Sequence, residues 1–393
     1  MTRSSCRGSA LSLAGLWIVL SGLALPVFAQ APEESQDTAE LPAWVRQVAL
    51  NGYGTWYYGK TSNENEILGA LENGSYETAN FHLSLAAAVS ERLRVVTQVE
   101  WRNDPDGSEE ALDYVFAEWK LTSEMRVRFG KAKMPFGIYS EFPDVGTLRP
   151  FLELPQAAYG PIGFLGENYK GVGLTGSLGS GGWRMGWDVY GGSTELEEDS
   201  TGEAFLLGEE LEPGEEIESE LTRDVIGGRL VVETPVSGLS FGASALSGIE
   251  EADVGRRRRV YGIQAEYSRD ALTVRAETMH EEVFEDLEAT GSYVEASYRF
   301  AGHWQVAAEA GHLRNEVFGI DPSGLLTQLL EHDDLALGVN YWFDDNLVVK
   351  LNYMRIRGNL YAHPPVDELP EIIEAGDLQE RTNVVLAGAQ FSF

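Results

Sequence analysis

Charged side chains alternate with apolar ones along many short segments of this 393-residue sequence. In residues 93–102, Arg94, Glu100 and Arg102 fall on even positions, whereas the odd positions hold Leu, Val, Thr and Trp. Charges with this spacing lie on one face of an extended chain. Where such a row faces water, it can attract, repel and orient ions and polar solutes, which is electrostatic selection rather than bond-making chemistry.

Residues 131–168 supply a second group of charges. They form the longest stretch between two alternating segments, and five prolines stiffen it. We expect this stretch to fold against the charged faces and to narrow the aqueous path between them. Its candidate constriction residues are Lys131, Lys133, Glu141, Asp144, Arg149 and Glu153. The candidates on the alternating segments are Arg94, Arg102, Arg126, Arg128, Arg184, Glu100 and Glu118. Opposed bases and acids would set up a transverse field, although each of these residues could instead be an ordinary solvated wall residue.

Motifs for catalysis and for metal binding are weak. The six histidines occur singly and no H-E-x-x-H pattern is present, so we expect no zinc site. Residues 171–176, GVGLTG, match a dinucleotide-binding pattern, but serine and glycine follow where that motif needs a helix. We therefore expect no cofactor and no enzymatic activity.

The elements that carry these charges are predicted to be strands. Alternation with a period of two marks a strand with one apolar and one polar face. About sixteen such segments occur, each roughly ten residues long, which is the length of a tilted strand that crosses a membrane. They begin near residues 46, 78, 92, 111, 125, 169, 182, 224, 239, 258, 271, 291, 303, 333, 346 and 381.

The connections between these segments alternate between short and long. Residues 90–91 and 301–302 are short turns, whereas 59–77 and 135–168 are long connections. Outer-membrane barrels have short turns on one side and long loops on the other. A soluble β-sandwich would instead have to bury many unpaired charges. The sequence thus predicts an all-β protein, a transmembrane antiparallel β-barrel of about sixteen strands whose third long loop folds inward.

The first 29 residues have the features of a secretory signal peptide. Arg3 and Arg7 precede an apolar run that ends at Pro26, and we expect cleavage after Ala29. A transmembrane anchor is the alternative, but the apolar run is short for one. The resulting division is a signal peptide at 1–29, a flexible periplasmic leader at 30–44 and the outer-membrane barrel at 45–393.

The chain is strongly acidic, with 62 Asp and Glu against 29 Lys and Arg and a formal net charge of −33. This charge argues against nucleic-acid binding, which relies on Lys and Arg at the phosphates. A mean hydropathy of −0.20 argues against membrane helices but not against a barrel, because only every second strand residue has to be apolar. Much of the excess acid lies in residues 193–220, where a solvated loop is favoured over a divalent-cation site.

Two stretches resemble known outer-membrane proteins. Residues 384–393, VVLAGAQFSF, resemble the last strand of Gram-negative outer-membrane proteins, which ends in Phe and is recognised by the barrel-insertion machinery. Residues 129–138, FGKAKMPFGI, resemble the start of the third loop in general and phosphate-selective (O/P-type) porins. The resemblance implies a homotrimer in the outer membrane, surrounded by lipid and lipopolysaccharide, with Phe393 as the insertion signal. The acidity of this chain departs from the O/P-type pattern.

These features predict a porin through which small hydrophilic solutes and ions diffuse passively across the Gram-negative outer membrane. One alternative is a substrate-selective channel for phosphate or organic anions, with the arginines as the attractive element. An alternative from another class is an outer-membrane barrel enzyme, a phospholipase or protease. Such an enzyme would need Ser, His or Asp groups that converge on one rim of the barrel.

Overall fold

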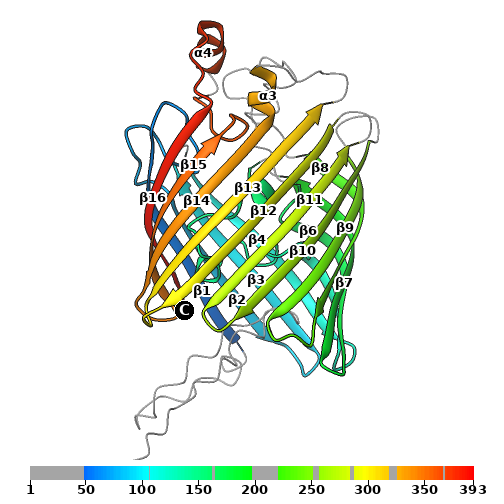
Figure 1. The fold of residues 1–393 in the computed structure, drawn as a ribbon. Coiled ribbons are helices and arrows are strands. Elements are labelled where there is room, and N and C mark those ends of the chain that lie inside the picture. Colours follow the sequence, from blue (N-terminus) through cyan, green and yellow to red (C-terminus); the bar gives the residue numbers. More distant parts are fainter. Residues whose placement is uncertain are drawn as a thin grey trace, which may run out of the picture.

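The computed structural model describes residues 48–105, 107–161, 164–196, 220–250, 256–283, 287–317, 325–365 and 368–393. The predicted signal peptide and leader, and most of the acidic stretch 193–220, lie outside the described residues. Within the described part, sixteen antiparallel strands pair in sequence order, and β1 pairs with β16 to close one barrel (Figure 1). The predicted all-β barrel and its strand number are confirmed.

The strands have the length that a tilted membrane crossing needs, from 9 residues in β5 to 14 in β1. Each begins within about four residues of its predicted start. In chain order they are β1 (Val48–Thr61), β2 (Ala79–Ala88), β3 (Leu93–Asp104), β4 (Gly107–Lys120), β5 (Met125–Lys133), β6 (Asn168–Ser180), β7 (Trp183–Leu196), β8 (Glu220–Glu233), β9 (Leu239–Glu250), β10 (Arg257–Arg269), β11 (Leu272–Val283), β12 (Leu287–Phe300), β13 (Trp304–Val317), β14 (Glu331–Trp342), β15 (Leu347–Arg357) and β16 (Arg381–Ser392).

Long and short connections lie at opposite ends of the barrel (Figure 1). The helices α3 (Leu325–Leu330) and α4 (Leu369–Ala375) lie at one end, and the C-terminus lies at the other end among the short turns. We call these the long-loop end and the short-turn end. None of the helices in the described part of the chain is long and apolar enough to span a membrane.

The wall of the barrel has an apolar outer face and a polar inner face. In β15 exposed and buried residues alternate without a break, so that Leu351 is 52% exposed while the neighbouring Lys350 is fully buried. Exposed apolar side chains of this kind occur all around the outside, as a surface in contact with lipid requires. The polar side chains between them point into the lumen.

The connection between β5 and β6, residues 134–167, runs inside the barrel, and we call it the inner loop. It contains a short 3-10 helix, η2 (Gly146–Leu148), and a one-turn helix, α1 (Gln156–Tyr159). Helix α1 packs against β11 to β14, and η2 packs against β16 and β1. Apolar side chains of the loop, such as Phe136 and Leu152, are buried in the lumen. The predicted inward folding of the third long loop is therefore confirmed.

A wall glycine shows how closely the inner loop approaches the strands. A Cβ atom on Gly291 of β12 would collide with the carbonyl oxygen of Ala157 in α1. The absence of a side chain at Gly291 therefore allows the α1 backbone to lie directly on the wall.

Candidate functional site

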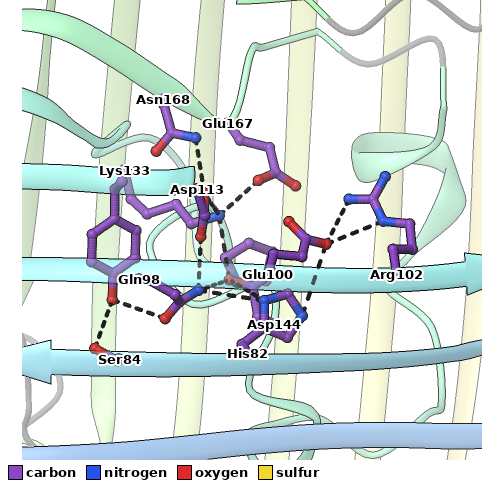
Figure 2. Close-up of polar contacts among 12 residues, drawn as sticks. His82, Ser84, Gln98, Glu100, Arg102, Asp113, Lys133, Asp144, Glu167 and Asn168 are labelled. Atoms are coloured by element: carbon purple, nitrogen blue, oxygen red, sulfur yellow. Dashed lines mark hydrogen bonds and ion pairs between the residues drawn. The ribbon is translucent and has the colours of Figure 1, made fainter. Parts of the chain in front are cut away.

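The inner loop meets the wall at a dense group of polar side chains, which we call the Asp144 cluster. Lys133, at the end of β5, is at its centre: its Nζ lies 3.0 Å from Asp113 Oδ1 on β4 and 3.3 Å from Asp144 Oδ2 on the inner loop (Figure 2). A third carboxylate oxygen, Oε2 of Glu167, lies 2.6 Å from the same ammonium. Lys133 therefore ties the inner loop to the wall at Asp144 and at its last residue, Glu167.

A glutamine completes this contact. The Nε2 group of Gln98 on β3 donates to Asp113 Oδ2 at 2.7 Å and to Asp144 Oδ2 at 2.9 Å. His82 on β2 lies beside Asp144, with its Nδ1 at 3.9 Å from Asp144 Oδ2. Every polar partner of Asp144 is thus a donor or a group that becomes positively charged on protonation.

The surroundings of Asp144 keep its carboxyl group ionised. Burial by itself raises the pKa of Asp144, but the charges of Lys133 and His82 and the hydrogen bond from Gln98 outweigh burial and hold the pKa at about 2. At neutral pH the inner loop therefore carries a fixed negative charge at this point, matched by the Lys133 ammonium.

Three residues of this cluster could in principle hold a metal ion. His82, Asp113 and Asp144 each offer one ligand atom, and these atoms lie within 4.8 Å of one another. The Lys133 ammonium and the Gln98 amide nitrogen already lie within hydrogen-bonding distance of both carboxylates. A cation would have to displace them, so the arrangement fits an internal ion pair better than a metal centre.

A second group of charges, the arginine cluster, lies on the neighbouring wall. Arg94, Arg126 and Arg128 converge on Glu118 of β4, with nitrogen–oxygen distances of 2.9, 3.8 and 3.2 Å. Arg128 also contacts Glu141 of the inner loop at 3.4 Å. All of these residues were predicted to face the aqueous path, and the structure brings them together.

Glu141 connects the arginine cluster to strands β7 and β8 of the wall. Arg229 of β8 binds both Glu141 and Asp188 of β7, the latter at 2.9 Å. Burial raises the pKa of Glu141, but the charges of Arg229 and Arg128 outweigh burial, and the pKa lies below its ordinary value. The inner loop is therefore fastened to the wall by ionised carboxylates at Glu141 and at Asp144.

In three of the wall pairs the arginine is more exposed to water than its acidic partner. The side chain of Arg94 is 25% exposed and that of its partner Glu118 is 7% exposed. The same order holds for Arg184 and Glu233, at 54% and 15%, and for Arg102 and Glu100, at 37% and 10%. At these three positions the acid lies behind the base, so the side chain nearer the water is positively charged. The order is reversed for Arg229 and Asp188, at 8% and 12%, and for Arg275 and Glu266, at 14% and 26%.

Two of the predicted loop residues have local roles. Arg149 donates from Nη1 to the carbonyl of Pro143 and from Nη2 to the carbonyl of Leu152, both at 2.6 Å, and thereby holds the turn around η2. Glu153 interacts with the hydroxyl of Tyr57 on β1. Neither residue pairs with the arginine cluster.

The prediction that Lys131 faces the constriction was wrong. Lys131 is paired in register with Val115 of β4 and Lys170 of β6, which are both exposed on the outer face. Its ammonium donates to the carbonyl of Leu112 at 3.0 Å, also on the outside. Since paired residues on adjacent strands point to the same face, Lys131 lies outside the lumen.

Sequence reasoning missed the polar wall residues that hold the backbone of the inner loop. The Nζ of Lys350 on β15 donates to the carbonyls of Gly146, Arg149 and Phe151 at 2.9, 2.7 and 2.9 Å. Asn340 of β14 donates to the carbonyl of Pro150 at 2.7 Å. The period-two pattern placed both side chains on the polar face, but no sequence pattern shows which loop atoms they meet.

Two tyrosines hold the opposite side of the inner loop. The hydroxyl of Tyr139 donates to Glu295 of β12 at 2.9 Å and accepts from Arg275 of β11 at 2.7 Å. The hydroxyl of Tyr159 donates to Glu277 of β11 at 2.6 Å. Burial raises the pKa of both tyrosine hydroxyls well above the ordinary value, so both remain donors. The inner loop is thus held from many sides of the lumen.

Comparisons with known proteins agree with this geometry. The family described as phosphate-selective porin O and P matches residues 258–393, about the last third of the chain. That match includes the C-terminal stretch 384–393 and leaves out 129–138. No curated protein sequence matches the chain.

Solved structures of outer-membrane proteins share the fold. An anion-selective porin from Comamonas acidovorans has 12% identity and a TM-score of 0.54, covering 88% of this chain and 99% of that one. OmpF of Salmonella typhi in complex with daunomycin has 12% identity and a TM-score of 0.55, covering 88% and 97%. In-vitro folded OmpT of Vibrio cholerae, in its trimer form, has 11% identity and a TM-score of 0.54, covering 88% and 99%. The barrel is of the outer-membrane porin type.

Proposed function

We propose that this protein is a passive diffusion channel for small hydrophilic solutes and ions in the Gram-negative outer membrane. The observation that carries the proposal is the inner loop, which is fastened across the lumen by Asp144, Glu141 and the carbonyls bound to Lys350. A barrel of sixteen strands is wide enough to leave an aqueous lumen, so a loop fastened inside it determines the narrowest point.

Planar-bilayer conductance of the refolded protein tests this function. Deletion of residues 140–160 should raise the single-channel conductance, because it removes the part of the inner loop that crosses the lumen. Deletion of residues 369–375, which form α4 at the long-loop end, is the matched control and should leave the conductance unchanged. A folded wild-type barrel that does not conduct would overturn the proposal.

A second candidate is a preference for anions. It is favoured by the exposure of Arg94, Arg102 and Arg184 in front of their buried partners. It is also supported by the match of residues 258–393 to a family described as phosphate-selective. The reversal potential in a KCl gradient gives the sign of the selectivity directly.

We also propose that Phe393 is an insertion signal, that the protein is a homotrimer, that it is cleaved after Ala29 and that it has no enzymatic activity. The backbone of Phe393 exchanges two hydrogen bonds with Gly52 of β1, at 2.9 and 3.0 Å, and its ring is 57% exposed on the outside. The exposed ring is available to the barrel-insertion machinery. A homotrimer is supported by the trimer form of the OmpT structure. Cleavage after Ala29 would be checked by mass spectrometry of the mature chain, and absence of enzymatic activity by lipid and peptide hydrolysis assays.

A further inference from the structure

A group of cations lies on the outer face of the barrel, at the long-loop ends of β15, β16 and β1, and we call it the outer basic patch (Figure 1). It consists of Arg355 and Arg357 of β15, Arg381 of β16 and Lys60 of β1, which are all exposed. On each strand these residues alternate with buried inner-face residues, so their side chains point away from the lumen. Diffusion through the lumen makes no use of them.

The strand register places the four cations side by side. Arg357 is paired directly with Arg381, and Arg355 is the diagonal neighbour of Arg381. Lys60 is paired with Val385, four residues after Arg381 on the same face of β16. The outer basic patch therefore extends over three adjacent strands, about 10 Å across the sheet.

Most of this positive charge is not neutralised by acidic side chains. Arg357 lies 2.7 Å from Glu380, but Lys60, Arg355 and Arg381 have no carboxylate within ion-pair distance among the described residues. Asp333, the acid paired in register with Arg357, is instead in contact with His312 at 2.5 Å. Like charges that lie directly opposite each other on a sheet destabilise it, so an anion between these cations would be favourable.

Below the outer basic patch the same face of β15 is apolar. Leu347, Val349 and Leu351 are 36%, 43% and 52% exposed, and Tyr353 above them is 43% exposed. Aromatic side chains of outer-membrane barrels lie where the hydrocarbon meets the headgroups. Arg355 follows Tyr353 by two residues, which is about 7 Å further along the strand. The patch therefore lies at the level of the lipid headgroups, on the long-loop side that faces the cell exterior.

We propose that the outer basic patch binds the phosphate groups of lipopolysaccharide, the phosphorylated glycolipid of the outer leaflet. Arginine binds phosphate through charge-assisted hydrogen bonds, and the acyl chains of the same molecule can lie along the apolar row of β15. A soluble anion would gain nothing from that apolar row, so the combination favours a lipid. The site depends on the position of the barrel in the membrane and not on diffusion through its lumen.

The chain provides matched control cations on the same face and at the same end. Arg259 of β10 and Arg314 of β13 are exposed on the outer face, but each has an acidic partner. Arg259 lies 3.6 Å from Glu282, and Arg314 lies 3.4 Å from Glu316. Replacement of these two arginines removes the same charge from the outer face without touching the outer basic patch.

Binding of lipid A, the phosphorylated anchor of lipopolysaccharide, to the folded protein in a neutral detergent tests the proposal. Native mass spectrometry counts the lipids bound per chain during a titration. The wild type should bind lipid A at least tenfold more tightly than the same lipid after enzymatic removal of its phosphates. The double variant Arg355→Gln/Arg381→Gln should lose at least tenfold in affinity for lipid A, since each charge contributes about fivefold. The control Arg259→Gln/Arg314→Gln should stay within twofold of the wild type.

The single variant Lys60→Gln provides a second test and should lower the affinity about fivefold. The mobility of unheated protein in gels reports whether each variant is folded. Equal affinity of the wild type and the Arg355→Gln/Arg381→Gln variant would overturn the proposal, as would an equal loss in the control. Phosphatidylglycerol or inorganic pyrophosphate that bound as tightly as lipid A would also contradict it. A change in the number of chains per complex with lipid A binding intact would show that a second copy of the chain occupies the patch instead.

Discussion

The Nζ group of Lys350 donates a hydrogen bond of 2.7 Å to the carbonyl of Arg149, 201 residues earlier in the chain. Two further carbonyls of the inner loop, those of Gly146 and Phe151, accept from the same nitrogen. The side-chain oxygen of Gln390 on β16 also lies within hydrogen-bonding distance of this nitrogen, so four acceptors share its N–H groups. One wall lysine thus holds the turn that carries η2, although it forms no ion pair with a loop carboxylate in the described part of the chain.

Replacement of Lys350 by Met should release this turn. The substitution keeps an unbranched side chain that is one atom shorter, but it leaves buried carbonyls without a donor, and we expect it to lower the free energy of unfolding by about 3 kcal/mol. The open-channel current should also become noisier, because the loop is less firmly held. Urea unfolding and single-channel recordings measure the two effects. Lys131→Met, on the outer face, is the matched control and should change neither.

Residues 93–102 show how much of this molecule could be predicted from its sequence. The period of two predicted the strand and the faces of Arg94 and Arg102. In each alternating segment the apolar residues must face lipid and the charged residues must face water, so only one orientation of the strand is possible. The same argument, applied along the chain, yielded all sixteen strands.

Asp113 shows where that reasoning stops. The pairing of β3 with β4 shifts between Gln98 and Val99, which leaves Asp113 as an extra residue that turns into the lumen. A bulge depends on contacts with Lys133 and Gln98 from other strands, and no local pattern signals it. The partners of the inner loop could not be predicted for the same reason, since they depend on where the loop lies in three dimensions.

Removal of the exposed arginines should shift the selectivity of the channel towards cations. A unit charge about 8 Å from a permeating ion in water contributes about 0.5 kcal/mol, with opposite signs for chloride and potassium, so Arg94→Gln should lower the chloride-to-potassium permeability ratio about fivefold. Arg184→Gln should act in the same direction. Reversal potentials in a KCl gradient measure the ratio. Lys131→Gln removes the same charge from the outer face, and an equal shift in that variant would contradict the assignment of the arginines to the pore.

The attachment of the inner loop should weaken in acid. The pKa of Asp144 is about 2 in the folded protein and has an ordinary value of 3.8, so its ion pair with Lys133 stabilises the fold above about pH 4. That contribution, about 2 kcal/mol, is lost as the pH falls from about 4 to about 2, because the carboxyl group becomes protonated. The lowered pKa of Glu141 acts in the same direction.

Urea unfolding midpoints between pH 2 and pH 6 measure this acid dependence. Asp144→Asn should be less stable at pH 6 and should show a smaller loss of stability below pH 4 than the wild type. Asp345→Asn is the control, since Asp345 lies exposed in a short turn and its side chain is 99% exposed. If Asp144→Asn kept the full acid dependence, Asp144 would not be its source.

The close approach of α1 to the wall should make Gly291 intolerant of any side chain. A Cβ at Gly291 would collide with the carbonyl oxygen of Ala157, so Gly291→Val must push the inner loop away from β12. The displaced loop should no longer hold one fixed position in the lumen. We expect the single-channel conductance to differ from that of the wild type by more than the experimental scatter, and the currents of its substates to be spread more widely. Gly179→Ala is the control, because the nearest atom to a Cβ at that position is 3.6 Å away. Equal conductance of Gly291→Val and the wild type would show that α1 does not lie on the wall at this point.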